Sequence, residues 1–177
     1  MHEIYLAGGC FWGTQHYLKQ IRGVLSTETG YANGRTENPT YEAVYTDRTG
    51  FAETVRVVYD PAVLPLRFLL DLYFRSIDPL SLNRQGGDCG TRYRTGIYYV
   101  DAADLPAIRA VCDRVAAEAG APLAVEVEPL RNFYPAEPFH QDYLEQHPDG
   151  YCHIPLALMQ AARQARPAAD ETAHETH

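Results

Sequence analysis

The sequence lacks any apolar run long enough for a transmembrane helix, and its N-terminus lacks the pattern of a signal peptide. Basic residues are scarce as well, because 15 Lys and Arg stand against 23 Asp and Glu, for a formal net charge of −8. An acidic protein repels nucleic acid and anionic lipid surfaces. We therefore expect no nucleic acid partner, no membrane partner and a cytoplasmic location.

The cysteines lack the spacing of a metal site. There are four of them, Cys10, Cys89, Cys112 and Cys152, and no two form a Cys-x-x-Cys pair. We therefore expect no bound metal. In a reducing compartment these side chains should be mainly free thiols, and any disulfide should be transient.

The chain shows no linker and no internal repeat. At 177 residues it is long enough to bury a core without disulfides or metal, which predicts a single domain over residues 1–163. After Pro167 the sequence has no apolar periodicity. We expect residues 164–177 to form a disordered tail.

Hydrophobic periodicity predicts the secondary structure. Leu66, Leu69, Leu70 and Tyr73, for example, follow the i, i+3, i+4, i+7 spacing of a helix that Pro65 opens. The expected strands cover residues 3–7, 24–32, 53–59, 94–100 and 125–128, and the expected helices cover 11–20, begin at 65 and follow Asp101.

The order of these elements up to residue 100 is β-α-β-β-α-β. This order is typical of a ferredoxin-like split βαβ core in a mixed α/β (α+β) fold, where helices cover one side of a mainly antiparallel sheet. An extra helix and strand within residues 103–130 would extend the core, and a long irregular C-terminal segment would wrap around it. Such a fold does not specify a function.

Cys10 stands in the run Gly-Gly-Cys-Phe-Trp-Gly at residues 8–13, beside the only tryptophan of the chain. A strand is expected before this run and a helix after it, so Cys10 should sit at a helix N-terminus, which favours a thiolate. Phe11 and Trp12 would form an apolar wall beside a reactive sulfur. A buried, unreactive cysteine in a glycine-rich turn is the alternative, and this segment alone does not decide between them.

Glu53 is the second candidate for chemistry, because it follows Phe51 and Ala52 where a strand begins. A carboxyl desolvated there would stay protonated and could donate a proton, whereas on an exposed edge strand it would have no such role. Cys112 lies on the apolar face of its expected helix and should be inert. Cys152 follows a turn, where it could move to meet another cysteine or could be a loop thiol without a role. Tyr41, Asp88, Tyr93 and Tyr151 also fall in turn-rich segments, where functional residues are common.

Seven short motifs follow one another along the chain. They are Gly-Cys-Phe-Trp-Gly at 9–13, Asn-Pro-Thr-Tyr at 38–41, Thr-Gly-Phe-Ala-Glu at 49–53, Gly-Asp-Cys-Gly-Thr-Arg-Tyr-Arg at 87–94, Phe-Tyr-Pro-Ala-Glu at 133–137, His-Gln-Asp-Tyr-Leu at 140–144 and Gly-Tyr-Cys at 150–152. Together they resemble the A-type methionine sulfoxide reductases. The resemblance runs from about residue 3 to residue 155, and the ordered series is specific.

The resemblance implies reduction of methionine S-sulfoxide, free or within proteins, to methionine, with no metal or organic cofactor. It assigns the attacking thiolate to Cys10 and the proton donor to Glu53, held protonated. In this resemblance Tyr41 and Tyr93 would donate hydrogen bonds to the sulfoxide oxygen. Phe11, Trp12 and Tyr151 would form an apolar cage for the S-methyl group. Asp88 would shape the surrounding hydrogen-bond network.

The resemblance also implies how the enzyme is recycled. Attack would leave a sulfenic acid on Cys10, Cys152 would condense with it to a disulfide, and thioredoxin would reduce that disulfide. We expect a monomer whose partners are thioredoxin and oxidised methionine.

The sequence departs from the usual family pattern at three positions, with Gln15 where glutamate is common, Phe51 where histidine is common, and Cys89 after Asp88. Gln15 should matter little, and Phe51 should make the surroundings of Glu53 less polar. Cys89 is either an additional redox thiol or a bystander. Cys152 is favoured as the recycling cysteine because its Gly-Tyr-Cys context matches.

Two other functions remain alternatives. A cysteine hydrolase would use Cys10 activated by His140 or His153 and oriented by Asp88, but this leaves Cys152 and the clustered tyrosines without a role. A redox sensor would bind oxidised methionine in a partner and signal through its disulfide. Repeated turnover of a free sulfoxide with dithiothreitol separates an enzyme from a sensor.

Overall fold

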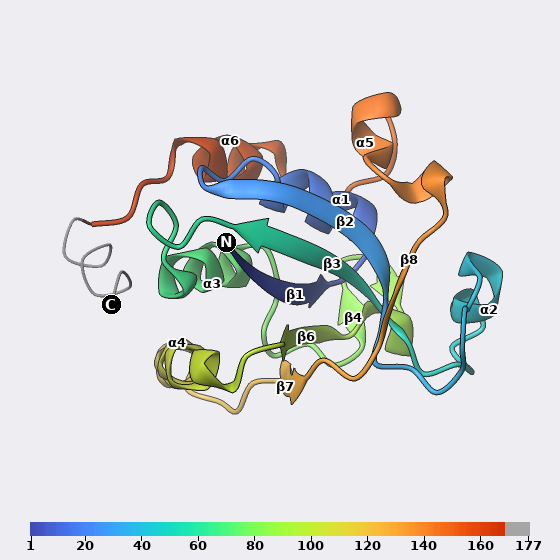
Figure 1. Cartoon of the computed structure of the whole chain (residues 1–177), viewed down its shortest axis with the longest axis horizontal. Coiled ribbons are helices and arrows are strands. Elements are labelled where there is room, and N and C mark those ends of the chain that lie inside the picture. The colour runs from blue at the N-terminus through green and yellow to red at the C-terminus, as the bar shows by residue number, and fades with distance from the viewer. Residues whose placement is uncertain (169–177) are drawn as a thin grey trace.

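A six-stranded, curled sheet forms the centre of the computed structural model, which describes residues 1–168 (Figure 1). The strand order is β7-β6-β1-β3-β2-β8, and the sheet is mixed because β6 and β7 are parallel while the other neighbouring pairs are antiparallel. The strands are β1 (His2–Gly8), β2 (Val24–Ala32), β3 (Ala52–Tyr59), β6 (Thr95–Tyr99), β7 (Glu126–Pro129) and β8 (Phe133–Pro135).

The main helices connect these strands, and α1 and α3 lie behind the sheet in the view of Figure 1. Helix α1 packs on β2, β3 and α6, and α4 packs on α3. The helices are α1 (Phe11–Leu18), α2 (Tyr41–Tyr45), α3 (Leu66–Arg75), α4 (Leu105–Ala119), α5 (Tyr143–Gln146) and α6 (Leu156–Gln164). The smaller elements are the hairpin of β4 (Arg84–Gln85) and β5 (Asp88–Cys89) and the 3-10 turns η1 (Thr91–Tyr93), η2 (Ala102–Asp104) and η3 (Pro138–His140).

The core lies mainly between the sheet and its helices. Side chains alternate along a strand, so every second residue of the central strands points at the helices. Each fully buried aliphatic side chain there contributes about 1.5–3 kcal/mol to folding. The strands contribute Ile4, Leu6, Val55, Val57 and Ile97, and α3 contributes Leu69, Leu70 and Tyr73.

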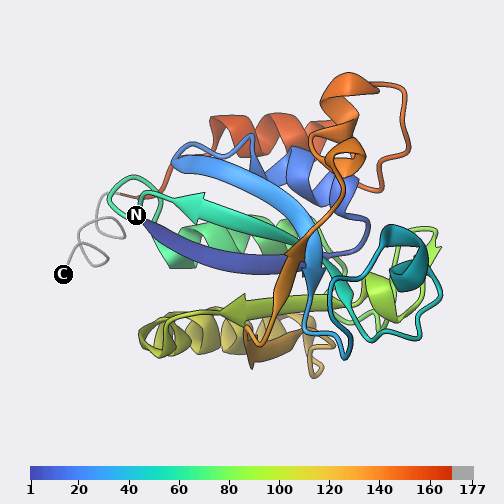
Figure 2. The same cartoon turned by 45° about the vertical axis from the view of Figure 1, so that its right-hand side comes forward.

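A smaller cluster covers the opposite face of the sheet. Tyr5 lies there, and the ring of Phe133 packs edge-on against it with 4.9 Å between ring centres. Phe133 belongs to β8, the strand that carries the chain across the sheet from β7 towards α5 (Figure 2). The C-terminal third therefore closes the face that the first hundred residues leave open.

The predicted strands and helices are present, with ends shifted by two residues or fewer where an end was predicted. Helix α1 ends at Leu18 rather than at residue 20, and Pro65 is the N-cap of α3. The expectation of an irregular C-terminal segment is wrong in part, because β8, α5 and α6 are regular. Residues 169–177 of the expected tail lie outside the described residues. Within residues 1–168, no helix is both long and apolar enough to cross a membrane.

Candidate functional site

Cys10 caps α1 at the point where β1 ends, as the glycine-rich run predicts. Its side chain is buried, with 7% exposed. Gly9 before it has a φ of +90°, and a Cβ there would lie 2.8 Å from the Cβ of Gln85. Only glycine fits this turn, which places the thiol directly at the start of the helix.

The structure corrects the expected ionisation of Cys10. Burial raises the pKa of the thiol, and the nearby carboxyl groups of Glu53 and Asp88 raise it further. The backbone amides of Trp12 and Gly13 lower it, as expected for a helix N-terminus, but their effect is smaller. In the free protein burial therefore favours the thiol of Cys10 over the thiolate that the helix N-terminus alone would favour.

Glu53 lies in the interior, not on an exposed edge. Strand β3 pairs on both sides, and Glu53 is 1% exposed opposite Tyr31 of β2. Its Oε1 accepts a hydrogen bond from the Phe11 amide at 3.1 Å, while its buried Oε2 has no hydrogen-bond partner within residues 1–168. Burial raises the pKa of Glu53 to about 8, so this carboxyl is protonated at neutral pH.

Two of the predicted tyrosines lie around this pair. Burial raises the pKa of Tyr41, at the start of α2, to about 12, and the carboxyl of Glu53 and the thiol of Cys10 contribute to the shift. Burial likewise raises the pKa of Tyr93, on η1, and the same two groups contribute. The fold therefore brings these four residues together, and both hydroxyls are hydrogen-bond donors at neutral pH.

His140 holds the aromatic wall beside Cys10 in place, a role that the sequence did not predict. Trp12 Nε1 donates to Nδ1 of buried His140 at 3.0 Å, and the indole stacks on Tyr143 with 3.8 Å between ring centres. The His140 ring also stacks on Tyr41, at 4.3 Å. Burial lowers the pKa of His140, which keeps it neutral and able to accept.

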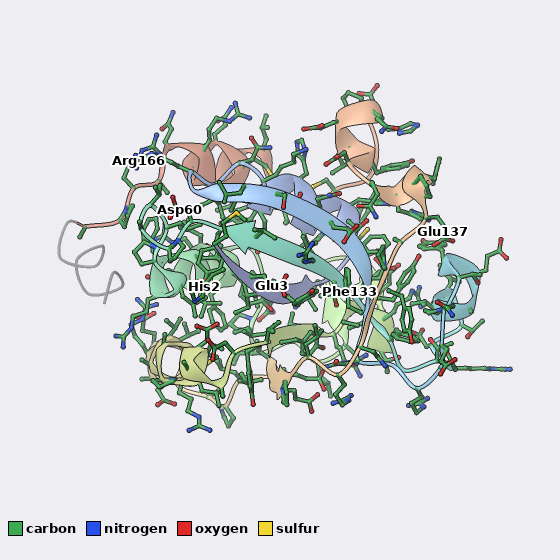
Figure 3. The ribbon with its side chains drawn as sticks, in the orientation of Figure 1. His2, Glu3, Asp60, Phe133, Glu137 and Arg166 are labelled. Carbon is green, nitrogen blue, oxygen red and sulfur yellow. The ribbon has the colours of Figure 1, made fainter. Side chains whose placement is uncertain are left out.

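Glu137 is a second residue without a predicted role. Its Oε1 accepts from the Tyr31 hydroxyl at 2.8 Å and its Oε2 from the Tyr41 amide at 3.1 Å. Burial raises the pKa of Glu137, but these hydrogen bonds together hold it below its usual value. Figure 3 shows Glu137 on the chain between β8 and α5, on the side towards α2. The motifs at 133–137 and 140–144 were the only sequence signal for these two residues.

Arg92 was likewise overlooked, although it lies in the motif at residues 87–94. Its Nη1 lies 2.6 Å from Asp47 Oδ2 and donates to the Tyr45 carbonyl at 3.1 Å. The guanidinium also lies over the rings of Tyr45 and Tyr93, at 4.2 and 4.3 Å from their centres. Arg92 therefore ties the end of α2 to η1, which carries Tyr93.

Asp88 and Tyr151 meet at the rim of the site. Asp88, on β5, is half-buried, and burial raises its pKa. The Tyr151 and Asp88 side chains lie close enough to shift each other's pKa, and the Tyr151 hydroxyl lies above the turn at Gly86. Tyr151 is 49% exposed in the free protein, so its place in the apolar cage with Phe11 and Trp12 stays a prediction for the substrate-bound form.

All four thiols are free. Cys152 lies against the first turn of α1, since a Cβ on Gly13 would come within 3.1 Å of its Sγ. Cys89 is exposed, and because it follows Asp88 in a strand its side chain points to the opposite face of the hairpin. Cys112 packs against the core, and burial raises its pKa to about 11. Cys152 is thus the second thiol on the Cys10 side of the fold.

An open groove of about 610 Å³ reaches Cys152 from outside. It runs between α1, α5 and α6, and its walls are mostly apolar. The lining residues are His16, Leu144, Glu145, Pro148, Gly150, Cys152, Ile154, Leu156 and Met159. Within residues 1–168, no three or more His, Cys, Asp or Glu side chains are grouped so as to hold a metal ion.

Comparison with known proteins accounts for this arrangement of thiols, carboxyl and tyrosines. The model of the family described as peptide methionine sulfoxide reductase matches residues 2–172. The chain belongs to this family. Peptide methionine sulfoxide reductase MsrA of Lachnoclostridium phytofermentans is 53% identical over 162 residues, which cover 92% of this chain and 98% of that protein.

Solved structures of family members are similar. The reduced form of Mxr1 from Saccharomyces cerevisiae is 38% identical, with a TM-score of 0.82 over 87% of this chain and 91% of that one. Mxr1 in complex with Trx2 is 30% identical, with a TM-score of 0.57 over 80% of this chain and 83% of that one. The family members thus share the fold that carries the site.

Proposed function

We propose that this chain is a peptide-methionine (S)-S-oxide reductase, which reduces methionine S-sulfoxide, free or in proteins, to methionine. The observation that carries the proposal is a buried thiol, Cys10, beside a buried carboxyl, Glu53, that keeps its proton at neutral pH. A sulfoxide sulfur is weakly electrophilic until its oxygen is protonated. Reduction therefore requires a nucleophile at the sulfur and an acid at the oxygen, and Cys10 and Glu53 can supply them.

The first step transfers the sulfoxide oxygen to Cys10. As Cys10 Sγ attacks the sulfoxide sulfur, Glu53 donates its proton to the oxygen, and the hydroxyls of Tyr41 and Tyr93 donate hydrogen bonds to it. The bond between Cys10 Sγ and the substrate sulfur and the substrate's sulfur–oxygen bond then break as a bond between Cys10 Sγ and this oxygen forms, so that methionine leaves and Cys10 becomes a sulfenic acid. The thiol proton of Cys10 replaces the proton that Glu53 gave.

The substrate binds against the aromatic wall. Phe11 and Trp12 face the S-methyl group, and His140 fixes the indole through its hydrogen bond. Tyr151 and Asp88 stand at the rim, where a bound peptide would cover them. Burial of this apolar group excludes water from the reacting atoms and strengthens the hydrogen bonds to the oxygen.

The second step forms a disulfide between Cys10 and Cys152, which thioredoxin then reduces. Cys152 is the candidate because it lies against the helix that Cys10 opens, while Cys89 points away from Asp88 and the rim. The groove at Cys152 gives a protein reductant access. The complex of the related Mxr1 with Trx2 supports thioredoxin as that reductant.

The hydrolase alternative has little support in the geometry. His140 Nδ1 already accepts the Trp12 indole proton, and His153 Nε2 lies 2.8 Å from the Gly8 carbonyl. Neither imidazole is shown bonded to Cys10, whereas the catalysis of hydrolysis needs a base that bonds to the nucleophile.

The proposal extends to the architecture and setting of the chain. The order β6-β1-β3-β2 supports a ferredoxin-like split βαβ core, to which β7, α4 and β8 are additions. The packing of α6 on α1 supports one catalytic domain over residues 1–163. We further propose a cytoplasmic monomer, and its four free thiols fit a reducing compartment.

Replacement of the nucleophile tests the function. The wild-type protein, pre-reduced and mixed with excess methionine S-sulfoxide without reductant, should release about one methionine per chain. Cys10→Ser should release none, and the matched control Cys112→Ser should behave like wild type. Turnover by Cys10→Ser, or equal turnover of the R epimer by wild type, would contradict the proposal.

A further inference from the structure

His153 is a half-buried side chain beside Cys152 that the reaction described above does not use. Its Nε2 lies 2.8 Å from the Gly8 carbonyl oxygen. A carbonyl can only accept, so Nε2 carries the hydrogen. In a neutral imidazole the other nitrogen, Nδ1, is then an unprotonated acceptor. This Nδ1 is buried and has no hydrogen-bond partner within the described part of the chain.

The basic nitrogen of His153 and the Cys152 thiol face the same small space. A Cβ built on Gly13 would lie 3.0 Å from His153 Nδ1 and 3.1 Å from Cys152 Sγ. The two atoms are therefore within about 6 Å of each other, above the helical turn that Cys10 opens. The thiol now points to the Ile154 carbonyl, at 3.4 Å, so a rotation about its χ1 angle would turn it towards Nδ1.

The neighbours of His153 hold the ring in one orientation. A Cβ on Gly9 would come within 3.1 Å of Nε2, and one on Gly86 within 3.3 Å of the His153 Cβ. Glycines on two separate segments thus leave room for this ring. Together with the bond to the Gly8 carbonyl, they fix which nitrogen faces Cys152.

The electrostatic surroundings of His153 suit a base. Burial lowers its pKa, while the bond to Gly8 and the carboxyl of Asp88 on β5 act in the opposite direction. The imidazole is therefore neutral at pH 7. When it takes up a proton, the Gly8 carbonyl and Asp88 stabilise the imidazolium. Burial also raises the pKa of Cys152, so this thiol needs a base to react.

We propose that His153 is the base of the recycling step, accepting the thiol proton of Cys152 at Nδ1 as Sγ attacks the sulfenic acid on Cys10. This inference rests on the proposed function. The Cys152 S–H bond and the Cys10 S–O bond break, and the S–S bond forms. Cys152 sulfur is oxidised, Cys10 sulfur is reduced, and the imidazolium returns its proton to the leaving hydroxide, so that water departs.

The test separates the two steps in one experiment. Pre-reduced protein is mixed with one equivalent of methionine S-sulfoxide, and released methionine, free thiols and dimedone-labelled Cys10 are followed in time. His153→Ala and His153→Gln should release methionine at the wild-type rate. Both should form the disulfide at least tenfold more slowly at pH 7, as expected for loss of a general base, and should accumulate labelled Cys10.

The pH dependence distinguishes a base from a merely structural residue. In the variants the disulfide rate should rise steeply towards pH 9 as Cys152 ionises unaided, and added imidazole should restore part of the rate in His153→Ala. His147→Gln, at an exposed histidine of the same region, is the control and should resemble wild type.

Disulfide formation at the wild-type rate between pH 6 and pH 9 in a folded His153 variant would overturn the role of His153. So would an equal loss in methionine release, because His153 would then support the site as a whole. If wild type itself releases no methionine, the proposed function fails instead. Should His153→Ala not fold, His153→Gln decides, since its amide can still donate to the Gly8 carbonyl.

Discussion

Cys10 and Glu53 occupy one buried space in which the negative charge of either disfavours that of the other. Burial raises the pKa of both groups, and the charge of Glu53 adds to the shift of Cys10. At neutral pH Glu53 is protonated and neutral, so this repulsion is removed. The thiol can therefore ionise at lower cost while Glu53 still carries its proton, and Glu53 can take up the thiol proton once it has given its own to the sulfoxide.

Glu53→Gln tests the acid directly. The amide can still accept the Phe11 N–H bond but cannot give up a proton, so methionine release in a single turnover should slow by about a hundredfold. In wild type this rate should fall as pH rises through about 8, where Glu53 loses its proton. Rapid-quench measurements from pH 6 to pH 9.5 should show this fall in the rate of methionine release in wild type but not in Glu53→Gln. An unchanged rate in the variant would remove Glu53 from the acid role.

The same substitution should stabilise the fold at neutral pH. Burial raises the pKa of Glu53 from about 4.5 to about 8, so between these values the unfolded chain loses a proton that the folded protein keeps. Wild-type stability should therefore be full below pH 4.5 and fall as pH rises towards 8. Urea unfolding should find Glu53→Gln more stable by about 3 kcal/mol at pH 7 and equal at pH 4. No gain at pH 7 would show that Glu53 is ionised there.

At the scale of elements, the site depends on short segments that have little core of their own. Helix α2 has five residues and η1 has three, and each carries one of the two tyrosines at the sulfoxide oxygen. Glu137 bonds to the first residue of α2, and Arg92 joins the end of α2 to η1. Polar contacts between segments thus do the positioning that packing does in the longer helices.

Arg92→Lys tests this tie. Lysine keeps the charge opposite Asp47 but loses the planar group that covers Tyr45 and Tyr93. We expect kcat to fall about tenfold through displacement of Tyr93, with a loss of about 1 kcal/mol in stability. The fall in the rate of methionine release near pH 8 should remain, since the positive charge near Glu53 is conserved. Arg56→Lys, in the partly exposed pair with Glu3, is the control and should retain wild-type kcat. Equal losses in both variants would contradict a specific tie at Arg92.

At the scale of the whole molecule, the sequence predicted what local patterns determine. The long strands and helices up to residue 100, the turn at Cys10 and the protein family follow from periodicity and motifs, whereas the short α2, β4, β5 and η1 were expected only as turns. Strand β8 was not predictable in this way, because three residues ending in proline show no alternation. Nor was the thiol form of Cys10, since the burial that raises its pKa comes from segments distant in sequence.

The roles of His140 and Glu137 could not be predicted from local sequence patterns either. Both lie more than 80 residues beyond Glu53, on the segment that crosses the sheet after β7, and only the folded chain brings them to Trp12 and Tyr41. Their motifs were visible in the sequence, but nothing in the motifs identified their partners. The C-terminal third therefore both completes the substrate site and carries the second thiol.

Because Cys152 belongs to that same third, the two steps of the cycle can be separated by one substitution. Cys152→Ser should release about one methionine per chain and then stop, because the sulfenic acid on Cys10 has no thiol to attack it and thioredoxin has no disulfide to reduce. Cys89→Ser should cycle like wild type, as expected for a thiol on the far face of its hairpin. Methionine release measured with thioredoxin, its reductase and NADPH distinguishes the two. Sustained cycling by Cys152→Ser together with failure of Cys89→Ser would assign the recycling thiol to Cys89.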